Sequence, residues 1–134
     1  MIYKKLLMCF IICTAIFGCK EAVNKEHVKD ISSKELLKII ESGDVQLIDV
    51  RTPAEFNEGY IENAKNVNFA SPSFAKDITT LDKDKPVIIY CRSGNRSGKS
   101  VKDFINAGFT KIYDFNGGIL EWKSEGLPLV TDTP

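Results

Sequence analysis

The sequence is poor in histidine, the side chain most often used for proton transfer and metal binding: His27 is the only one in 134 residues. His27 lies in a polar stretch near the N-terminus, where a solvated linker residue is expected. A Cys–His dyad of the thiol-protease kind is therefore not expected, and neither is a His/Cys metal cluster. The sequence predicts a protein with no bound metal and no cofactor.

The sequence also lacks an excess of charge of either sign. It has 18 basic and 18 acidic side chains, with no block of five like charges. A nucleic-acid surface would show clustered basic residues, so no nucleic-acid partner is predicted. No fixed-period repeat is visible, and the length and apolar pattern fit one core. We therefore expect a single domain and a monomer.

The first eighteen residues have the pattern of a targeting segment and stay outside the predicted fold. Lys4 and Lys5 form a short positive region, and residues 6–17 form an apolar run too short to span a membrane comfortably. The run ends in Gly18-Cys19, which resembles a bacterial lipobox, so residues 1–18 are predicted as a signal peptide and Cys19 as the lipidated residue. This predicts an exported lipoprotein, periplasmic or associated with the outer membrane and held by its lipid. An uncleaved anchor and an ordinary secretory signal are the alternatives.

Cysteine is scarce in the remainder of the chain. Cys9 and Cys13 fall in the signal and Cys19 is the predicted lipid site, which leaves Cys91 as the only other thiol. The mature domain can then form no internal disulfide. A single thiol outside the cytoplasm is exposed to oxidation, so we expect it to be reactive.

Strands and helices alternate along the rest of the chain. Residues 19–27 are predicted as a polar tether and residues 28–131 as the domain. Two capping boxes predict helix starts, Ser32 with Glu35 and Thr52 with Glu55. Such alternation predicts an α/β domain with a parallel sheet flanked by helices on both faces. Strands are expected at residues 28–31, 45–50, 64–69, 87–90 and 111–114, and a helix at 74–81.

The chain is organised around residues 87–100, VIIYCRSGNRSGKS. A buried strand at 87–90 ends at Cys91, and a helix follows with apolar residues at 101, 104 and 105. Cys91 therefore lies between the carboxyl end of a strand and the amino end of a helix, where an anion is favoured. Arg92 and Arg96 add positive charge, and such settings lower the pKa of a thiol. The alternative is a small buried core cysteine.

Three groups of residues follow one another along the chain: Asp49-Val50-Arg51, Glu55-Phe56, Gly59-Tyr60-Ile61, Ala64 and Asn66-Val67, then Cys91 to Ser97, then Gly117-Gly118, Trp122 and Gly126-Leu127-Pro128. In this order they resemble the three motifs of the rhodanese-like (thiosulfate sulfurtransferase-like) family, with Tyr60 where His is common and Asn63 where Gly is frequent. The resemblance implies a rhodanese-like fold and a Cys91 persulfide, held by a substrate-binding loop of Arg92, Ser93, Gly94, Asn95, Arg96 and Ser97.

The implied activity is transfer of sulfane sulfur from thiosulfate, or a related persulfide donor, to a thiol or protein acceptor. Related cysteine phosphatases and arsenate reductases have one residue more between the cysteine and the arginine, so the four residues between Cys91 and Arg96 favour sulfur transfer. A sulfur carrier or protein-docking module with little thiosulfate turnover is the first alternative, and an oxyanion enzyme the second. A nucleotide-binding P-loop is disfavoured, because three residues rather than four separate Gly94 from Gly98.

Two charged residues, Asp49 and Arg51, lie at or just after the end of the strand expected at 45–50, and we expect them to support the site without contacting the substrate. Asp49 could reach the site, but a capped turn with Arg51 and Glu55 in an ion pair is at least as good an interpretation. Arg51 is expected to be structural.

Overall fold

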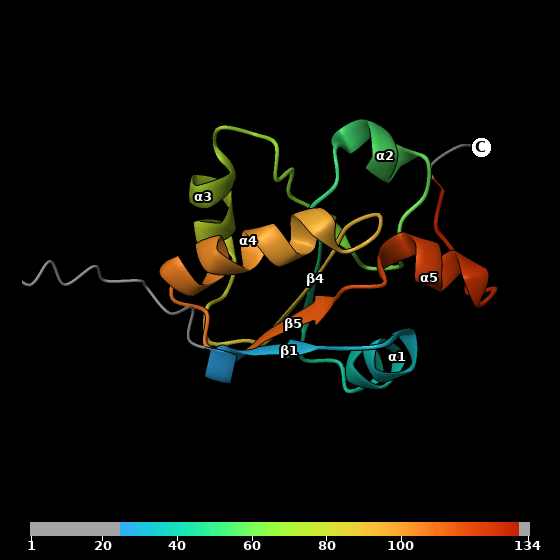
Figure 1. Cartoon of the computed structure of the whole chain (residues 1–134), viewed down its shortest axis with the longest axis horizontal. Helices are drawn as coiled ribbons and strands as arrows, with labels where there is room; N and C mark the ends of the chain where they lie inside the picture. The colour runs from blue at the N-terminus through green and yellow to red at the C-terminus, as the bar shows by residue number, and fades with distance from the viewer. Residues whose placement is uncertain (1–24, 132–134) are drawn as a thin grey trace, which may run out of the picture.

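The computed structural model describes residues 25–131 and shows one five-stranded sheet with helices around it (Figure 1). All strand pairs are parallel, in the order β1-β5-β4-β2-β3. The strands are β1 (Val28–Asp30), β2 (Gln46–Asp49), β3 (Lys65–Asn66), β4 (Val87–Tyr90) and β5 (Ile112–Phe115). The helices are α1 (Ser33–Glu41), α2 (Pro53–Asn57), α3 (Phe74–Asp77), α4 (Asn95–Asn106) and α5 (Gly118–Ser124), with 3-10 turns η1 (Lys25–His27) and η2 (Ile78–Thr80).

The sheet separates two hydrophobic clusters, which confirms the predicted α/β architecture. Phe74 of α3 and Phe104 of α4 pack on one face, while Leu36 of α1 and Trp122 of α5 pack on the other. In Figure 1, α3 and α4 accordingly lie above the strands and α1 lies below them. Every residue of β4 is fully buried, because this strand is central and covered on both faces.

Both predicted capping boxes are present. The Ser32 hydroxyl accepts a hydrogen bond from the N–H of Glu35, whose carboxylate accepts one from the N–H of Ser32. Thr52 and Glu55 make the same reciprocal pair at the start of α2, with Pro53 in the first helical position. These bonds satisfy N–H groups that the first turn of a helix leaves free, so a local signal fixes where each helix begins.

Three expected elements differ from those observed. The strand expected at 64–69 is reduced to β3, although the Val67 N–H still bonds to the Asp49 carbonyl and the Phe69 N–H to the Val50 carbonyl. The helix expected at 74–81 is divided into α3 and η2. The end of the expected tether, residues 25–27, forms η1, and His27 Nδ1 lies 3.0 Å from the Thr110 carbonyl oxygen. The predicted signal, Cys19 and the rest of the tether lie outside the described residues.

A buried ion pair closes the carboxyl end of β2. The Arg51 guanidinium donates to both Asp49 carboxylate oxygens, at 2.6 Å to Oδ2, and to the Gly59 carbonyl oxygen at 2.8 Å. The two side chains are 5% and 0% exposed. The expected Arg51–Glu55 pair is therefore wrong, because the nearer buried carboxylate of Asp49 takes the guanidinium. The pair fixes the turn into α2.

We expect Arg51→Met to lower the free energy of unfolding by about 3–5 kcal/mol, because it leaves the Asp49 carboxylate buried without its cation. Urea unfolding at neutral pH measures the change. Lys85→Met is the matched control, since its ion pair with Asp44 is exposed to solvent and little change in stability is expected. Equal losses in the two variants would contradict this role for the buried pair.

Candidate active site

Cys91 lies where the sequence places it, directly after the carboxyl end of β4. The loop that follows leads into α4, which begins at Asn95. On the opposite side, the first turn of α5 faces the start of the loop: the N–H groups of Ile119 and Leu120 donate to the carbonyl oxygens of Cys91 and Arg92, at 3.0 and 3.1 Å. The loop is therefore held between the amino ends of two helices.

Two glycines allow this close packing. Gly94 caps α4 in the left-handed conformation with φ of 94°, and a β-carbon there would collide with the Asn116 carbonyl oxygen. Gly118 has φ of 62°, and a β-carbon there would lie 2.5 Å from the Arg92 carbonyl oxygen. Both positions need positive φ and have no room for a side chain, which only glycine satisfies without strain.

The Cys91 sulfur is surrounded by hydrogen-bond donors. The side chain is 1% exposed, and Sγ accepts a hydrogen bond from the Gly94 N–H at 3.1 Å. The Ser97 hydroxyl lies 3.8 Å from Sγ. Burial alone would raise the pKa of the Cys91 thiol. Hydrogen bonds from the N–H groups of Ser97, Ser93 and Gly94 and from the Ser97 hydroxyl outweigh burial, so the pKa lies below its ordinary value. The arrangement favours a thiolate.

Arg96 makes a contact that the sequence reasoning missed. Its guanidinium donates to both oxygens of the Glu55 carboxylate, at 2.7 and 2.8 Å, and each side chain is 29% exposed. This hydrogen-bonded pair is the main reason that the pKa of Glu55 falls to about 2. The sequence did contain a signal, since Glu55 lies in the first turn of α2 just beyond β2, the neighbour of β4, and carboxyl ends of parallel strands meet at one edge.

The other predicted site residues divide into two groups. Arg92, Ser93 and Asn95 are exposed on the outer side of the loop, and Ser97 is fully buried beneath it. Asp49 and Arg51 bind each other, and Arg51 also binds the Gly59 carbonyl oxygen, so neither contacts the sulfur through these bonds. The structure thus brings residues 92–97 around Cys91 and places the Asp49–Arg51 pair at the end of the neighbouring strand.

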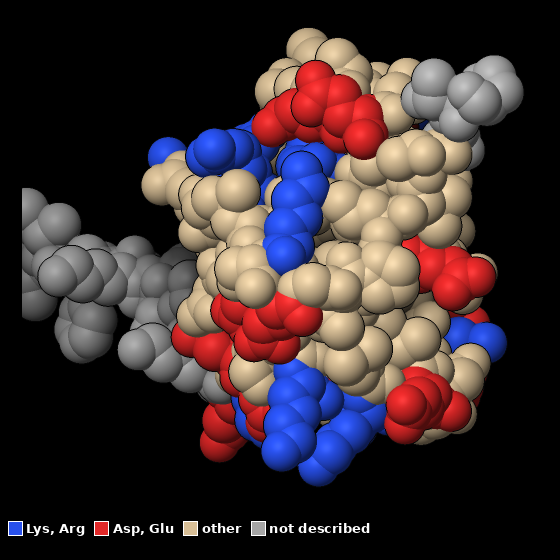
Figure 2. Space-filling model, turned by 90° about the vertical axis from the view of Figure 1, so that its right-hand side faces the viewer, with Lys and Arg blue, Asp and Glu red and all other residues tan. Residues whose placement is uncertain are grey.

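Charges of both signs surround this end of the molecule. Figure 2 views the side on which α2 and α5 lie, and basic side chains near the centre of this face have acidic side chains above and below them. Within residues 25–131, no group of three or more metal-ligating side chains occurs, and no helix is long and apolar enough to cross a membrane.

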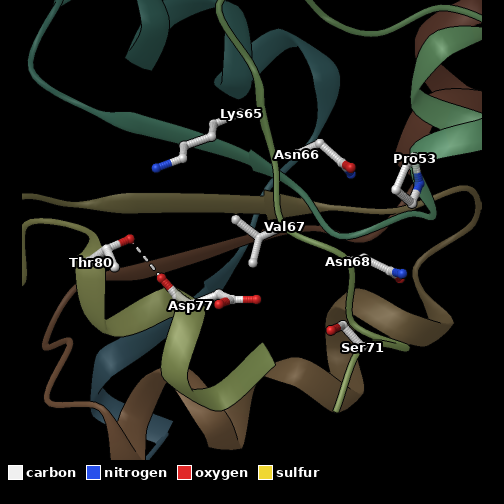
Figure 3. Close-up of a pocket in the computed structure, with 8 residues that line it drawn as sticks. All are labelled: Pro53, Lys65, Asn66, Val67, Asn68, Ser71, Asp77 and Thr80. Carbon is white, nitrogen blue, oxygen red and sulfur yellow. Dashed lines mark hydrogen bonds between the residues drawn. The ribbon is translucent and has the colours of Figure 1, made fainter. Parts of the chain in front are cut away.

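A polar pocket of about 430 Å³ lies at the β3 edge, and none of its lining residues belongs to the Cys91 loop (Figure 3). It is lined by Pro53, residues 65–68, Ser71, Asp77 and Thr80. Asn66 at its rim donates hydrogen bonds to the carbonyl oxygens of Asp49 and Arg51. The pocket therefore adjoins the turn after β2, and Cys91 lies outside its lining.

Proteins of similar sequence carry sulfurtransferase names. A sulfurtransferase of Allochromatium vinosum is 35% identical over 104 residues, which cover 77% of this chain and 95% of that protein. The thiosulfate sulfurtransferase GlpE of Shewanella oneidensis is 31% identical over 94 residues, covering 70% and 91%. The chloroplastic thiosulfate sulfurtransferase 16 of Arabidopsis thaliana is 35% identical over 91 residues, covering 60% and 76%.

Solved structures agree with the sequence relatives. A rhodanese-related protein from Thermoplasma volcanium superposes with a TM-score of 0.69 at 31% identity, covering 78% of this chain and 99% of that one. A rhodanese-like domain protein from Staphylococcus aureus gives 0.65 at 33% identity, with the same coverage. The sequence profile of the rhodanese-like domain matches residues 32–125, and the chain therefore belongs to the rhodanese-like family.

Proposed function

We propose that this protein is a sulfurtransferase that carries sulfane sulfur on Cys91 between thiosulfate, or a related persulfide donor, and a thiol acceptor. The observation that carries the proposal is the buried Sγ that accepts a hydrogen bond from the Gly94 N–H, in a loop whose hydrogen bonds from Ser93, Gly94 and Ser97 lower the pKa of the thiol. A persulfide anion has the same need for donors as a thiolate. The sulfurtransferase relatives add support from sequence.

The transfer proceeds in two nucleophilic steps. The Cys91 thiolate attacks the outer sulfur of thiosulfate, a new S–S bond forms, and the S–S bond of thiosulfate breaks with its electron pair leaving on sulfite. The N–H groups of the Cys91 loop then hold the persulfide anion by hydrogen bonds. A thiolate acceptor, or cyanide in the test tube, attacks the outer persulfide sulfur and the electron pair returns to Cys91. Neither step removes a proton from carbon or oxygen, so the reaction needs no histidine base.

The two loop arginines have unequal parts in this reaction. The charge of Arg96 is largely balanced by the Glu55 carboxylate, with which it forms two hydrogen bonds. Arg92 is exposed beside Cys91, where its side chain can meet an incoming anion. We therefore assign attraction of the sulfonate end of thiosulfate to Arg92, and maintenance of the loop shape to Arg96.

Cys91→Ala is expected to reduce thiosulfate:cyanide sulfurtransferase activity to the uncatalysed background, because Cys91 is the only thiol among residues 25–131 that could accept the sulfur. Thiocyanate formation measures the activity. Peptide mapping by mass spectrometry should locate one added sulfur atom on the Cys91 peptide after treatment of the wild-type protein with thiosulfate.

The outcomes separate the alternatives. Equal rates for wild type and Cys91→Ala would overturn the proposal. A stable persulfide with negligible thiocyanate formation would indicate a sulfur carrier. Hydrolysis of an aryl phosphate that depends on Cys91 would indicate an oxyanion enzyme.

Glu55→Gln is expected to lower the KM for thiosulfate by roughly fivefold, because one unbalanced positive charge beside a solvated anion is worth about 1 kcal/mol. The glutamine can keep the bond to the Thr52 N–H that caps α2, since Gln also serves in a capping box. Steady-state kinetics at low ionic strength measures the change. Glu58→Gln, exposed at the end of the same helix, is the control; a KM that rises in Glu55→Gln alone would contradict the charge argument.

We further propose that Cys19 carries the lipid that attaches this domain to a bacterial membrane. The support is the Gly18-Cys19 pattern after the apolar run, with a polar stretch between it and the folded domain. In cells given labelled fatty acid, Cys19→Ala is expected to lose the label and to move from the membrane to the soluble fraction. The control variant Cys13→Ala should keep the label and stay in the membrane fraction. If Cys19→Ala still carries the label, Cys19 is not the lipidated residue.

A further inference from the structure

Asp114 is a buried carboxyl group that the sulfur-transfer steps do not use. It is 4% exposed, and its Oδ1 has no hydrogen-bond partner among the described residues. Ile112, two positions earlier in β5, packs in the cluster that α4 covers, so Asp114 faces the same helix because strand side chains alternate between faces. A buried polar atom without a partner is costly and needs an explanation.

The surroundings of Asp114 are the first turn of α4 and two strands. A β-carbon on Gly98 would lie 3.6 Å from Oδ2, which places the carboxyl group against this turn. In the sheet, its register partners are Asp30 on β1 and Ile89 on β4. Two groups therefore act on the Asp114 carboxyl group: the charged Asp30 on the neighbouring strand and the polar Ser97 on the helix.

The ionisation of Asp114 is strongly affected by this position. Burial raises the pKa of Asp114 to about 6, a hydrogen bond with Ser97 opposes the rise, and the negative charge of Asp30 adds to it. Asp114 therefore changes charge close to neutral pH, whereas an ordinary aspartate is ionised throughout that range.

Ser97 connects this carboxyl group to the sulfur. Its side chain is fully buried, and its Oγ lies 3.8 Å from Cys91 Sγ and 3.3 Å from the Gly94 carbonyl oxygen. A hydroxyl has one proton to donate and lone pairs to accept with. Ser97 can therefore direct its proton to the sulfur, to the Gly94 carbonyl or to Asp114, but to only one fully at a time.

We infer that Asp114 is a positioning residue that governs, through the Ser97 hydroxyl, how many hydrogen bonds reach the Cys91 sulfur. When Asp114 is neutral, its O–H donates to Ser97 Oγ and the Ser97 hydroxyl donates to the thiolate. When Asp114 releases its proton to solvent, the Ser97 hydroxyl turns to the carboxylate, and the sulfur keeps only its N–H donors.

The direction of the effect follows from these two states. As the pH rises through about 6, Asp114 becomes ionised. The thiolate then loses a hydrogen bond and gains a nearby negative charge, and both changes raise the pKa of the Cys91 thiol. The thiol of the wild-type protein should therefore ionise over a wider pH range than a single isolated group.

The test is the pH dependence of Cys91 alkylation by iodoacetamide, followed by peptide mapping, in wild type and in Asp114→Asn. The asparagine is neutral at every pH and its amide can donate to Ser97 Oγ, so it imitates protonated Asp114. We expect the alkylation profile of Asp114→Asn to shift toward acid by about 1 pH unit. No sulfur donor is present, so the outcome does not depend on the proposed sulfurtransferase activity.

Ser97→Ala distinguishes a relay from a direct charge effect. In a Ser97→Ala background, Asp114→Asn should shift the profile much less than it does alone. An unchanged profile in Asp114→Asn would overturn the inference, and so would a full shift that persists without Ser97. If Asp114→Asn does not fold, the wild-type profile decides: an inflection near pH 6 that Ser97→Ala removes supports the relay, and its absence from wild type overturns it.

Discussion

Two opposing effects on the Cys91 sulfur organise the site: burial raises the pKa of the thiol, and hydrogen bonds from the loop lower it. Burial of Cys91 at the end of the central strand would by itself keep the thiol neutral. The Gly94 N–H and the donors of Ser93 and Ser97 outweigh the effect of burial and lower the pKa of the thiol, because they replace the hydrogen bonds that an anion loses on leaving water. The chain places these donors through the left-handed Gly94 at the start of α4. The first turn of α5 holds the other side of the loop.

Glu55 links two parts of the molecule that serve this sulfur. One oxygen of its carboxylate, Oε2, accepts from the Thr52 N–H to cap α2 and also from the Arg96 guanidinium of the loop. The end of β2 is in turn fixed by the buried Asp49–Arg51 pair. At the carboxyl edge of the sheet, the cap of α2 and the Cys91 loop are therefore joined directly through Glu55, beside the buried Asp49–Arg51 pair.

Local signals in the sequence predicted most of the fold and the centre of the site. The two capping boxes, the apolar residues of β4 and the loop after Cys91 each act over a few residues, and each is found as expected. The partner of Arg51 was mistaken, because Asp49 and Glu55 both lie within four residues of it and spacing does not decide between them. In the structure Glu55 pairs instead with Arg96, 41 residues further along the chain, which no local pattern shows. Asp114 was missed for the same reason: one acidic residue in a short strand gives no sign that it faces Ser97 under a helix.

The contact between α5 and the loop also determines the polarity of the site. Because the carbonyl oxygens of Cys91 and Arg92 accept hydrogen bonds from the N–H groups of Ile119 and Leu120, their lone pairs point toward α5. The backbone groups directed at the sulfur are N–H groups. A species with negative charge on its outermost sulfur meets partial positive charge there, whereas a cation would find no oxygen ligands turned toward it from these two peptides. The first turn of the short final helix thereby leaves N–H groups, and not these two carbonyl oxygens, facing the Cys91 sulfur.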